Sequence, residues 1–256
     1  MSFENYSMED EIVLFGAGWK ALSLIDVYGK TSFTLWLCGC NLRCPFCHNY
    51  MLAECDKSLC RKVDVRGLLE RLYLSRRFVD YFLVSGGEPL LQYSRLALLL
   101  KHVKVDFGVN IAVNSNLTLV REVERLLEDG LCDYLLTDLK VPHVQLYGLP
   151  EEESEKMWRM YLESLKIVSG YRVPVEVRVP VLRNVNLKKF EEEAIEAFNM
   201  LDGGCKYYVR VNPILGEPYT LPRDRIWSFK HCNPSVRDVE EVRNILIKLG
   251  LYDKIV

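Results

Sequence analysis

The chain has 256 residues, of which 49% are hydrophobic and 27% are charged, and its formal net charge is −2. This length and composition are ordinary for one folded domain, so we expect a single domain over residues 1–256. The balance of 33 basic and 35 acidic residues gives no electrostatic signal for nucleic acid. No apolar run approaches the roughly 18–20 residues that span a bilayer, and residues 1–10 are too polar for a signal peptide. We therefore expect a cytoplasmic protein that binds neither nucleic acid nor a membrane.

Short runs of β-branched or aromatic residues alternate along the chain with segments of helical periodicity. The first predicted strand runs straight into a cysteine-rich loop, and the second is followed by the loop GGEP. The acidic run at 151–156 is expected to begin a helix at the protein surface. In chain order, the predicted elements are strand 31–37, helix 63–77, strand 80–85, helix 93–103, strand 107–115, helix 119–130, strand 132–140, helix 156–170, strand 173–182, helix 187–201, strand 206–215 and helix 235–250, with Ser235 as N-cap and Gly250 past the end.

Six strands in alternation with helices predict a parallel sheet with right-handed crossovers. Six strands are too few to close the usual eight-stranded barrel. The predicted fold class is therefore α/β, a partial (β/α)6 TIM-type barrel that is open on one side. The functional site of such a barrel lies at the carboxyl ends of the strands, where we expect both the cysteine loop and the GGEP loop.

The cysteine loop, CGCNLRCPFCHN at 38–49, contains four of the nine cysteines, and Cys40, Cys44 and Cys47 have the spacing C-x3-C-x2-C. In a reducing compartment, clustered thiols indicate metal binding or catalysis more often than disulfides. A structural zinc ion bound with His48 is one interpretation, although zinc ligands usually form two separated pairs. The other is a [4Fe–4S] cluster with three protein ligands. Its fourth iron stays open and can chelate a small molecule through an amine and a carboxylate.

The segment CNLRCPFC resembles the signature of the radical S-adenosylmethionine (SAM) enzymes. The resemblance implies that Cys40, Cys44 and Cys47 hold a [4Fe–4S] cluster and that SAM binds the open iron. One electron from the reduced cluster then breaks a C–S bond of the sulfonium, giving methionine and a 5′-deoxyadenosyl radical. Phe46 corresponds to the family's residue beside the adenine of SAM. The adjacent residues Cys47 and His48 are also predicted cofactor contacts. Taken alone, Phe46 could equally be a core residue.

Two later segments resemble parts of the family's SAM site. SGGEPLLQ at 85–92 resembles the segment whose backbone contacts the methionine amino group of SAM, so Gly87 is the predicted contact and Glu88 a supporting one. Glycine permits such a close approach. By itself, this segment is only a turn.

TDLK at 137–140 matches the DLK segment of the pyruvate formate-lyase activating enzyme, which lines the SAM site. In an extended chain, Asp138 and Lys140 point the same way and suit an amino-acid zwitterion or a ribose, although an exposed ion pair is the alternative. Three further residues complete the predicted SAM contacts: Leu139 of the same segment, Asn114 near the end of an earlier predicted strand, and Arg178, which needs an anionic partner or a route to solvent in its apolar strand.

Residues 18–49 resemble the N-terminal block of glycyl-radical-enzyme activating enzymes, nearest the branch assigned to anaerobic ribonucleoside-triphosphate reductase. The resemblance implies that the chain removes a hydrogen atom from a backbone glycine of a partner protein such as anaerobic ribonucleotide reductase. It also implies a flavodoxin- or ferredoxin-type electron donor. Two alternatives stay open: a radical SAM enzyme for a small molecule or peptide, such as a 7-carboxy-7-deazaguanine synthase, and a non-catalytic, zinc-stabilised binding module.

Cysteines outside the C-x3-C-x2-C motif are a departure from the family pattern. Cys38 stands where relatives commonly carry glutamine, and Cys55 and Cys60 follow the loop as a pair. With Cys132, Cys205 and Cys232 they could form an auxiliary site. Scattered buried thiols are the interpretation that we favour.

Overall fold

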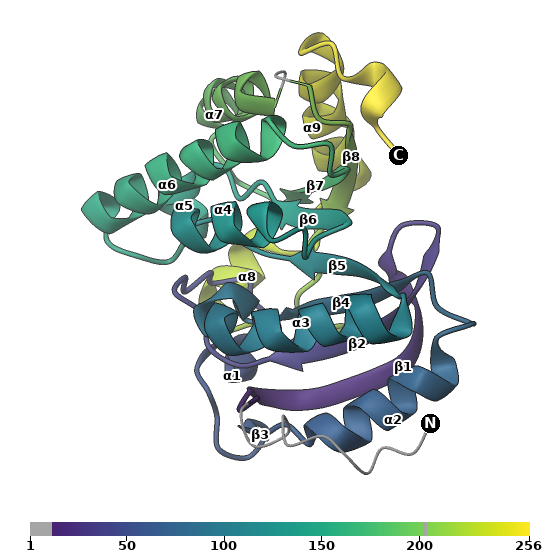
Figure 1. Ribbon diagram of the computed structural model, residues 1–256. Helices are drawn as coiled ribbons and strands as arrows, with labels where there is room; N and C mark the ends of the chain where they lie inside the picture. Colours follow the sequence, from purple (N-terminus) through teal and green to yellow (C-terminus); the bar gives the residue numbers. More distant parts are fainter. Residues whose placement is uncertain (1–11, 202–203) are drawn as a thin grey trace. The chain divides into compact units, whose positions relative to one another are not determined.

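The computed structural model describes residues 12–201 and 204–256 (Figure 1). They form two compact units. The first contains residues 12–40, 51–114 and 125–134, and the second contains residues 41–50, 115–124 and 135–256. The prediction of a single domain stays a prediction, and residues 1–10, on which the signal-peptide argument rests, lie outside the described residues.

The first unit is a mixed sheet with helices packed on it. Strands β2 and β4 are parallel, as are β4 and β5, whereas β1 runs antiparallel to both β2 and β3. Within this unit the order is β3-β1-β2-β4-β5. Its elements are β1 (Phe15–Val27), β2 (Lys30–Leu37), β3 (Arg61–Lys62), α2 (Val65–Ser75), β4 (Tyr81–Gly86), the 3₁₀ helix η2 (Pro89–Gln92), α3 (Tyr93–Phe107) and β5 (Asn110–Asn114). The short helix α1 (Tyr50–Ala53) follows the cysteine loop.

The core of the first unit forms where aliphatic residues of neighbouring strands lie in register. Leu35 of β2 is opposite Val84 of β4, which is opposite Val113 of β5, and all three side chains are buried. Helix α3 packs against β5 and follows η2 directly (Figure 1). The helix ends at Gly108, which adopts the left-handed conformation that favours glycine at this position.

The second unit has three parallel strands in the order β6-β7-β8. Helices α6 and α7 lie side by side, and α9 packs along β7 and β8 (Figure 1). Its elements are β6 (Tyr134–Asp138), α5 (His143–Leu146), α6 (Glu151–Ser169), β7 (Val175–Val181), α7 (Leu187–Leu201), β8 (Tyr207–Pro213), α8 (Arg225–His231), α9 (Val236–Lys248) and the 3₁₀ helix η3 (Tyr252–Lys254). The first residue of β6, Tyr134, belongs to the first unit. Helix α4 (Val120–Glu128) connects residues of the two units along the chain.

The predicted alternation of strands and helices is confirmed, and so is the α/β class. Every predicted strand and helix is present, with bounds that differ by a few residues. Three glutamates lie in the first turn of α6, where they favour helix formation at its positive end, so the acidic run does begin a helix. Within the described ranges, no helix is both long and apolar enough to cross a membrane.

Seven elements were not predicted: strands β1 and β3, the short helices α1, α5 and α8, and the 3₁₀ helices η2 and η3. Strand β1 pairs with β2 through several register irregularities, and Leu24 and Ile25 on it are exposed. The irregular pairing removes the period-two alternation of buried residues on which strand prediction depends.

Candidate functional site

The cysteine loop is held by backbone hydrogen bonds from the segment before α8. The N–H of Arg223 donates to the carbonyl of Cys47 at 3.0 Å, and the N–H of Asp224 donates to the carbonyl of Pro45, also at 3.0 Å. The indole of Trp227 lies against Phe46, with ring centroids 6.1 Å apart. These contacts fix the backbone of the loop between Cys44 and Cys47.

A second segment, Tyr147 and Gly148, contacts the same loop from after α5. The N–H of Arg43 donates to the carbonyl of Tyr147 at 2.9 Å. A Cβ placed on Gly148 would lie 2.0 Å from the carbonyl oxygen of Arg43, and Gly148 has a φ of 67°. Glycine is required here both by the backbone conformation and by the close approach of the loop.

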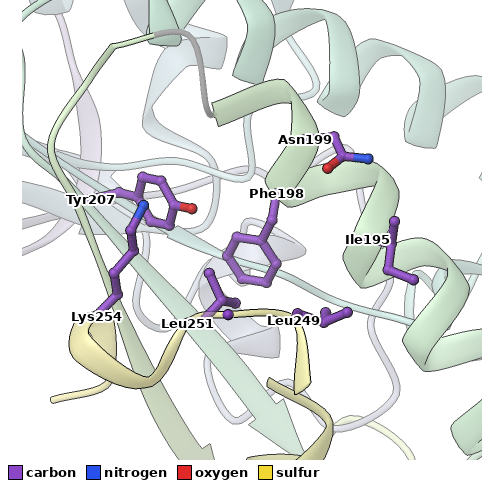
Figure 2. Close-up of a pocket in the computed structure, with 8 residues that line it drawn as sticks. Ile195, Phe198, Asn199, Tyr207, Leu249, Leu251 and Lys254 are labelled. Atoms are coloured by element: carbon purple, nitrogen blue, oxygen red, sulfur yellow. The ribbon is translucent and has the colours of Figure 1, made fainter. Parts of the chain in front are cut away.

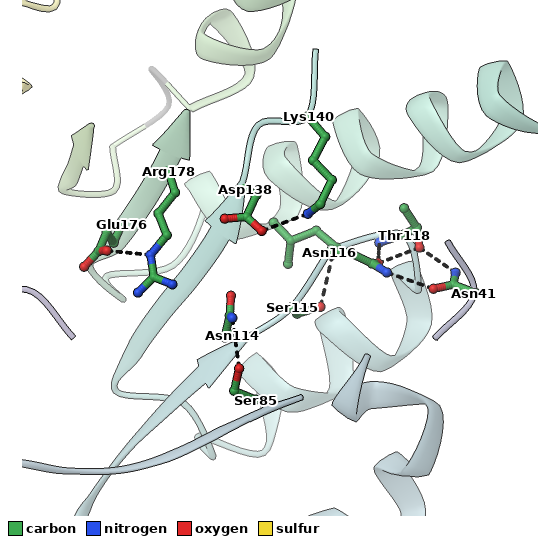
Figure 3. Close-up of polar contacts among 11 residues, drawn as sticks. Asn41, Ser85, Asn114, Ser115, Asn116, Thr118, Asp138, Lys140, Glu176 and Arg178 are labelled. Carbon is green, nitrogen blue, oxygen red and sulfur yellow. Dashed lines mark hydrogen bonds and ion pairs between the residues drawn. The ribbon is translucent and has the colours of Figure 1, made fainter. Parts of the chain in front are cut away.

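A network of amides and a hydroxyl supports the loop at Asn41 (Figure 3). The side-chain amide of Asn41 donates to the Thr118 hydroxyl at 2.7 Å and accepts from the amide of Asn116 at 2.8 Å. The Asn116 oxygen in turn accepts from the backbone N–H of Thr118. Because Asn41 immediately follows Cys40, the turn at 115–118 helps to set the start of the C-x3-C segment.

The motif thiols differ in exposure. Cys44 is buried, and Cys40 and Cys47 are half-buried. Burial raises the pKa of the Cys47 thiol, while the nearby cations Arg223 and Lys140 act in the opposite direction. The pKa of this thiol is raised overall, so the two cations offset only part of the effect of burial.

Asp138 and Lys140 form a half-buried ion pair at the end of β6, with 3.0 Å between the carboxylate and the ammonium (Figure 3). The Lys140 side chain is only 11% exposed, so the alternative of an exposed ion pair is wrong. Burial alone would lower the pKa of Lys140, but Asp138 and Cys44 reverse this effect and hold it above its usual value. Burial would raise the pKa of Asp138, but Lys140 and Arg178 more than compensate and hold it below its usual value. Both groups are therefore charged at neutral pH.

Arg178, which lies in an apolar strand, has an anionic partner. Its Nε lies 2.8 Å from a carboxylate oxygen of Glu176, a fully buried side chain two residues earlier on β7. Arg210 on the adjacent strand β8 is 3.6 Å from the same oxygen. The two arginines neutralise a buried carboxylate, and Glu176 orients the Arg178 guanidinium.

Three other predicted contacts lie in the second unit. Phe46 is buried against Trp227. His48 is exposed. The Leu139 side chain is in the core and its N–H donates to the carbonyl of Arg178, so its side chain is not available to a ligand.

The remaining predicted contacts, Gly87, Glu88 and Asn114, lie in the first unit with Cys40. A Cβ on Gly87 would lie 2.0 Å from the carbonyl oxygen of Gly39, and the N–H of Glu88 donates to that oxygen at 2.6 Å. The glycine therefore permits contact with the loop that precedes Cys40. The Glu88 carboxylate is buried and accepts from the N–H of Leu90, and the Asn114 amide donates to the Ser85 hydroxyl at 3.0 Å.

Two pockets lie within the second unit. One, of about 180 Å³, lies next to Lys254, whose ammonium is 3.4 Å from the centroid of the Tyr207 ring, and none of the predicted contacts lines it (Figure 2). The other, of about 610 Å³, adjoins the cysteine loop. It is lined by Arg43, Pro45, Gly148, Arg223, Asp224, Arg225 and Ile226.

Within the second unit, the motif thiols Cys44 and Cys47 thus lie in the electrostatic field of Lys140, with Asp138 and Arg178 beside it. A sequence model described as the Radical SAM superfamily matches residues 35–196, more than half of the chain. The chain belongs to the radical SAM superfamily. This membership confirms the resemblance of CNLRCPFC and the predicted class of α/β partial barrel.

Two relatives of this radical SAM chain align over more than two thirds of it. A Methanocaldococcus jannaschii protein, provisionally named a glycyl-radical enzyme activating enzyme, is 28% identical over 192 residues, which are 73% of this chain and 75% of the relative. The pyruvate formate-lyase-activating enzyme of Staphylococcus epidermidis is 27% identical over 193 residues, 69% of this chain and 72% of that enzyme. A solved domain of a pyruvate-formate lyase-activating enzyme from Bacteroides vulgatus is 20% identical over 68% of this chain and 96% of that domain, with a TM-score of 0.48.

Family membership implies a [4Fe–4S] cluster and SAM, and the donor set of this radical SAM chain fits both. Thiolates are the ligands of such clusters, and cations near Cys44 and Cys47 stabilise negative charge there. Lys140 and Arg178 could bind a carboxylate, and Asp138 could accept from an amine or a ribose hydroxyl.

Several residues around the radical SAM motif were not predicted: Arg223, Trp227, and the pair Asn116 and Thr118. Each reaches the loop from a distant part of the chain, and none belongs to a local pattern. Glu176 was also not predicted, but a local pattern could have indicated it. A glutamate two positions before Arg178 on one strand points to the same face as the arginine.

Proposed function

We propose that this chain is a glycyl-radical-enzyme activating enzyme, which removes a hydrogen atom from a backbone glycine of a partner such as an anaerobic ribonucleotide reductase. The observation that carries the proposal is the half-buried Asp138–Lys140 pair near Cys44 and Cys47 of a radical SAM motif. The names of the two aligned relatives favour the activating branch. A flavodoxin- or ferredoxin-type protein is the proposed electron donor.

In this proposal Cys40, Cys44 and Cys47 hold the cluster. When bound, the cluster and SAM together supply the reductive cleavage of the sulfonium that yields a 5′-deoxyadenosyl radical. Lys140 and Arg178 bind the methionine carboxylate of SAM, and Asp138 accepts a hydrogen bond from its amine or from the ribose. Phe46 packs beside the adenine, and the backbones at Gly87 and Leu139, with Glu88, Asn114 and His48, complete the contacts.

A protein substrate is supported by the segment that follows β8. Ile226 is 76% exposed and Phe229 is 85% exposed, and Leu215, Tyr219 and Leu221 in the same segment are also exposed. The segment is hydrogen-bonded to the cysteine loop at Pro45 and Cys47. Exposed aromatic and aliphatic residues next to arginines are typical of the centres of protein interfaces. We propose that this surface binds the loop of the partner that carries the glycine.

Anaerobic assay with a purified partner tests the proposed function. The reconstituted chain, SAM and a low-potential reductant should give an organic glycyl radical signal in electron paramagnetic resonance only when the partner is present. SAM cleavage that produces no partner radical but converts a small molecule such as a 7-deazaguanine precursor would favour the small-molecule alternative.

Replacing Lys140 by methionine should weaken SAM binding. A hydrogen bond to a charged group contributes about 1.5–3 kcal/mol, so we expect the dissociation constant of SAM to rise about 10- to 100-fold. Equilibrium dialysis of SAM with the reconstituted protein measures this change. Lys140→Arg, which keeps the charge, should recover part of the affinity, and Lys188→Met on the exposed face of α7 is the control. Wild-type affinity in Lys140→Met would contradict the assigned contact.

Replacing Phe229 by aspartate should reduce partner activation without reducing SAM cleavage in the absence of partner. The substitution introduces a charge into the proposed interface but touches no residue that we assign to SAM or the cluster. We expect at least a tenfold fall in the rate of glycyl radical formation, since interface anchors commonly contribute about 2 kcal/mol or more. Phe78→Asp, at an exposed phenylalanine of the first unit, is the matched control. Equal loss in both variants would argue against this surface.

A further inference from the structure

Three cysteines outside the radical SAM motif lie together in the first unit. The sulfur atoms of Cys38 and Cys60 are bonded, and their Cα atoms are 6.2 Å apart. The expectation of free buried thiols is therefore wrong for these two residues, and it is wrong for Cys55 because that thiol is exposed. The expectation is confirmed for Cys132, Cys205 and Cys232, which are buried and not disulfide-bonded.

The disulfide closes a covalent loop around the motif. It joins residues 22 positions apart, and Cys40, Cys44 and Cys47 all lie between them in the sequence. Cys38 is two residues before the first motif cysteine. While this bond is intact, the two ends of the cluster-binding segment cannot move far apart.

The third cysteine, Cys55, lies near Gly39, the residue that follows Cys38. The carbonyl of Leu52 accepts from the N–H of Gly39 at 2.9 Å and from the N–H of Cys55 at 3.1 Å, and the Cys60 sulfur is 3.9 Å from it. A Cβ placed on Gly39 would lie 3.7 Å from the Cys55 sulfur. The neighbours of Cys38, Cys55 and Cys60 thus meet around one backbone carbonyl.

The three sulfur-bearing residues differ in accessibility. Cys55 is exposed, Cys60 is half-buried and Cys38 is only 2% exposed. A reagent in solution therefore reaches Cys55 first and Cys38 last.

We propose that Cys38, Cys55 and Cys60 form a thiol–disulfide exchange site, with Cys55 as its entry point, that reversibly closes the cluster-binding segment. The exchanging partner is a low-molecular-weight disulfide or a dithiol. This inference does not depend on the proposed function, because it concerns residues that contact neither SAM nor the partner in that proposal.

The exchange runs in three steps from the reduced form. Cys55 attacks a disulfide RSSR, forming Cys55–S–S–R and releasing one RSH. Cys60 then attacks the Cys55 sulfur and releases the second RSH, and Cys38 attacks Cys60 to form the Cys38–Cys60 bond and restore the Cys55 thiol. Overall, two thiols lose two electrons and two protons, and RSSR becomes two RSH. A dithiol reverses the sequence.

Thiol mapping of the full-length chain tests the proposal. Purified anaerobically without added thiols and alkylated, the chain should give a peptide linked through Cys38 and Cys60, with Cys55 alkylated. After reduction with dithiothreitol and its removal, oxidised glutathione should first appear on Cys55 and then leave as the linked peptide forms. A chain that alkylates fully at Cys38, or that never forms this linked peptide, would overturn the proposal.

Variants separate an exchange site from a static crosslink. Cys55→Ser should still form the Cys38–Cys60 bond, but about tenfold more slowly with oxidised glutathione, because the attack must then begin at a less accessible sulfur. Cys60→Ser should retain glutathione on Cys55. Cys132→Ala, at a buried thiol, should reoxidise at the wild-type rate. Wild-type kinetics in Cys55→Ser would refute its role as entry point. None of these readouts needs SAM cleavage, so they stand apart from tests of the activating function.

Discussion

Alanine in place of any one of Cys40, Cys44 and Cys47 should abolish SAM cleavage. Each variant removes one of the three thiolates that we assign to the cluster, and no other cysteine of the loop is free to replace it, because Cys38 is bonded to Cys60. We expect the iron content after reconstitution to fall sharply and dithionite-driven release of 5′-deoxyadenosine to fall to background. Iron analysis and chromatography of the nucleoside products measure both effects.

Cys232→Ala is the matched control for these variants. Cys232 is fully buried, lies outside the loop and is not disulfide-bonded. Its substitution should leave iron content and turnover close to those of the wild type. Retained turnover in a motif variant would contradict the ligand assignment, and equal loss in Cys232→Ala would indicate general damage to the fold.

Alanine in place of Gly148 should prevent cluster assembly without removing any thiol. The new Cβ would lie 2.0 Å from the Arg43 carbonyl oxygen and 2.6 Å from its carbon, so one of the two backbone segments must move. Because Arg43 precedes Cys44, the motif moves with it. We expect a several-fold fall in iron bound after reconstitution and a loss of about 3 kcal/mol or more in the free energy of unfolding.

Gly130→Ala separates this clash from the cost of the backbone conformation. Gly130 has a φ of 63°, close to the 67° of Gly148, but no atom lies within 4 Å of the position of its Cβ. It should lose only about 1–2 kcal/mol of stability and bind iron normally. If both variants bind iron equally well, the contact between Gly148 and Arg43 does not control the loop.

The sequence predicted those parts of the structure that depend on local patterns. The helix expected over 187–201 has these bounds, and α9 begins after Ser235 with the side chains of Ser235 and Asp238 capping it reciprocally. Helix α3 runs four residues past its predicted end, because Gly108 rather than an earlier residue adopts the left-handed C-terminal conformation. Periodicity and caps were enough to give the order of strands and helices.

Contacts between distant residues were not predictable in the same way. The Cys38–Cys60 bond joins two cysteines that no local spacing pairs, and Trp227 meets Phe46 across most of the chain. Gly87 was predicted for its closeness to SAM, which stays a prediction; its close approach to Gly39 of the cysteine loop was not predicted. The Tyr28–Gly29 turn could have indicated the hairpin of β1 and β2, since a glycine at the second central position permits the positive φ that Gly29 has.

Anaerobic reconstitution of the purified chain with iron and sulfide tests the central claim most directly. We predict about four iron atoms per chain, the visible absorbance of an iron–sulfur cluster, and cleavage of SAM when dithionite is added. A chain that takes up no cluster under these conditions, and instead holds one zinc ion with all four positions filled by side chains, would contradict the account.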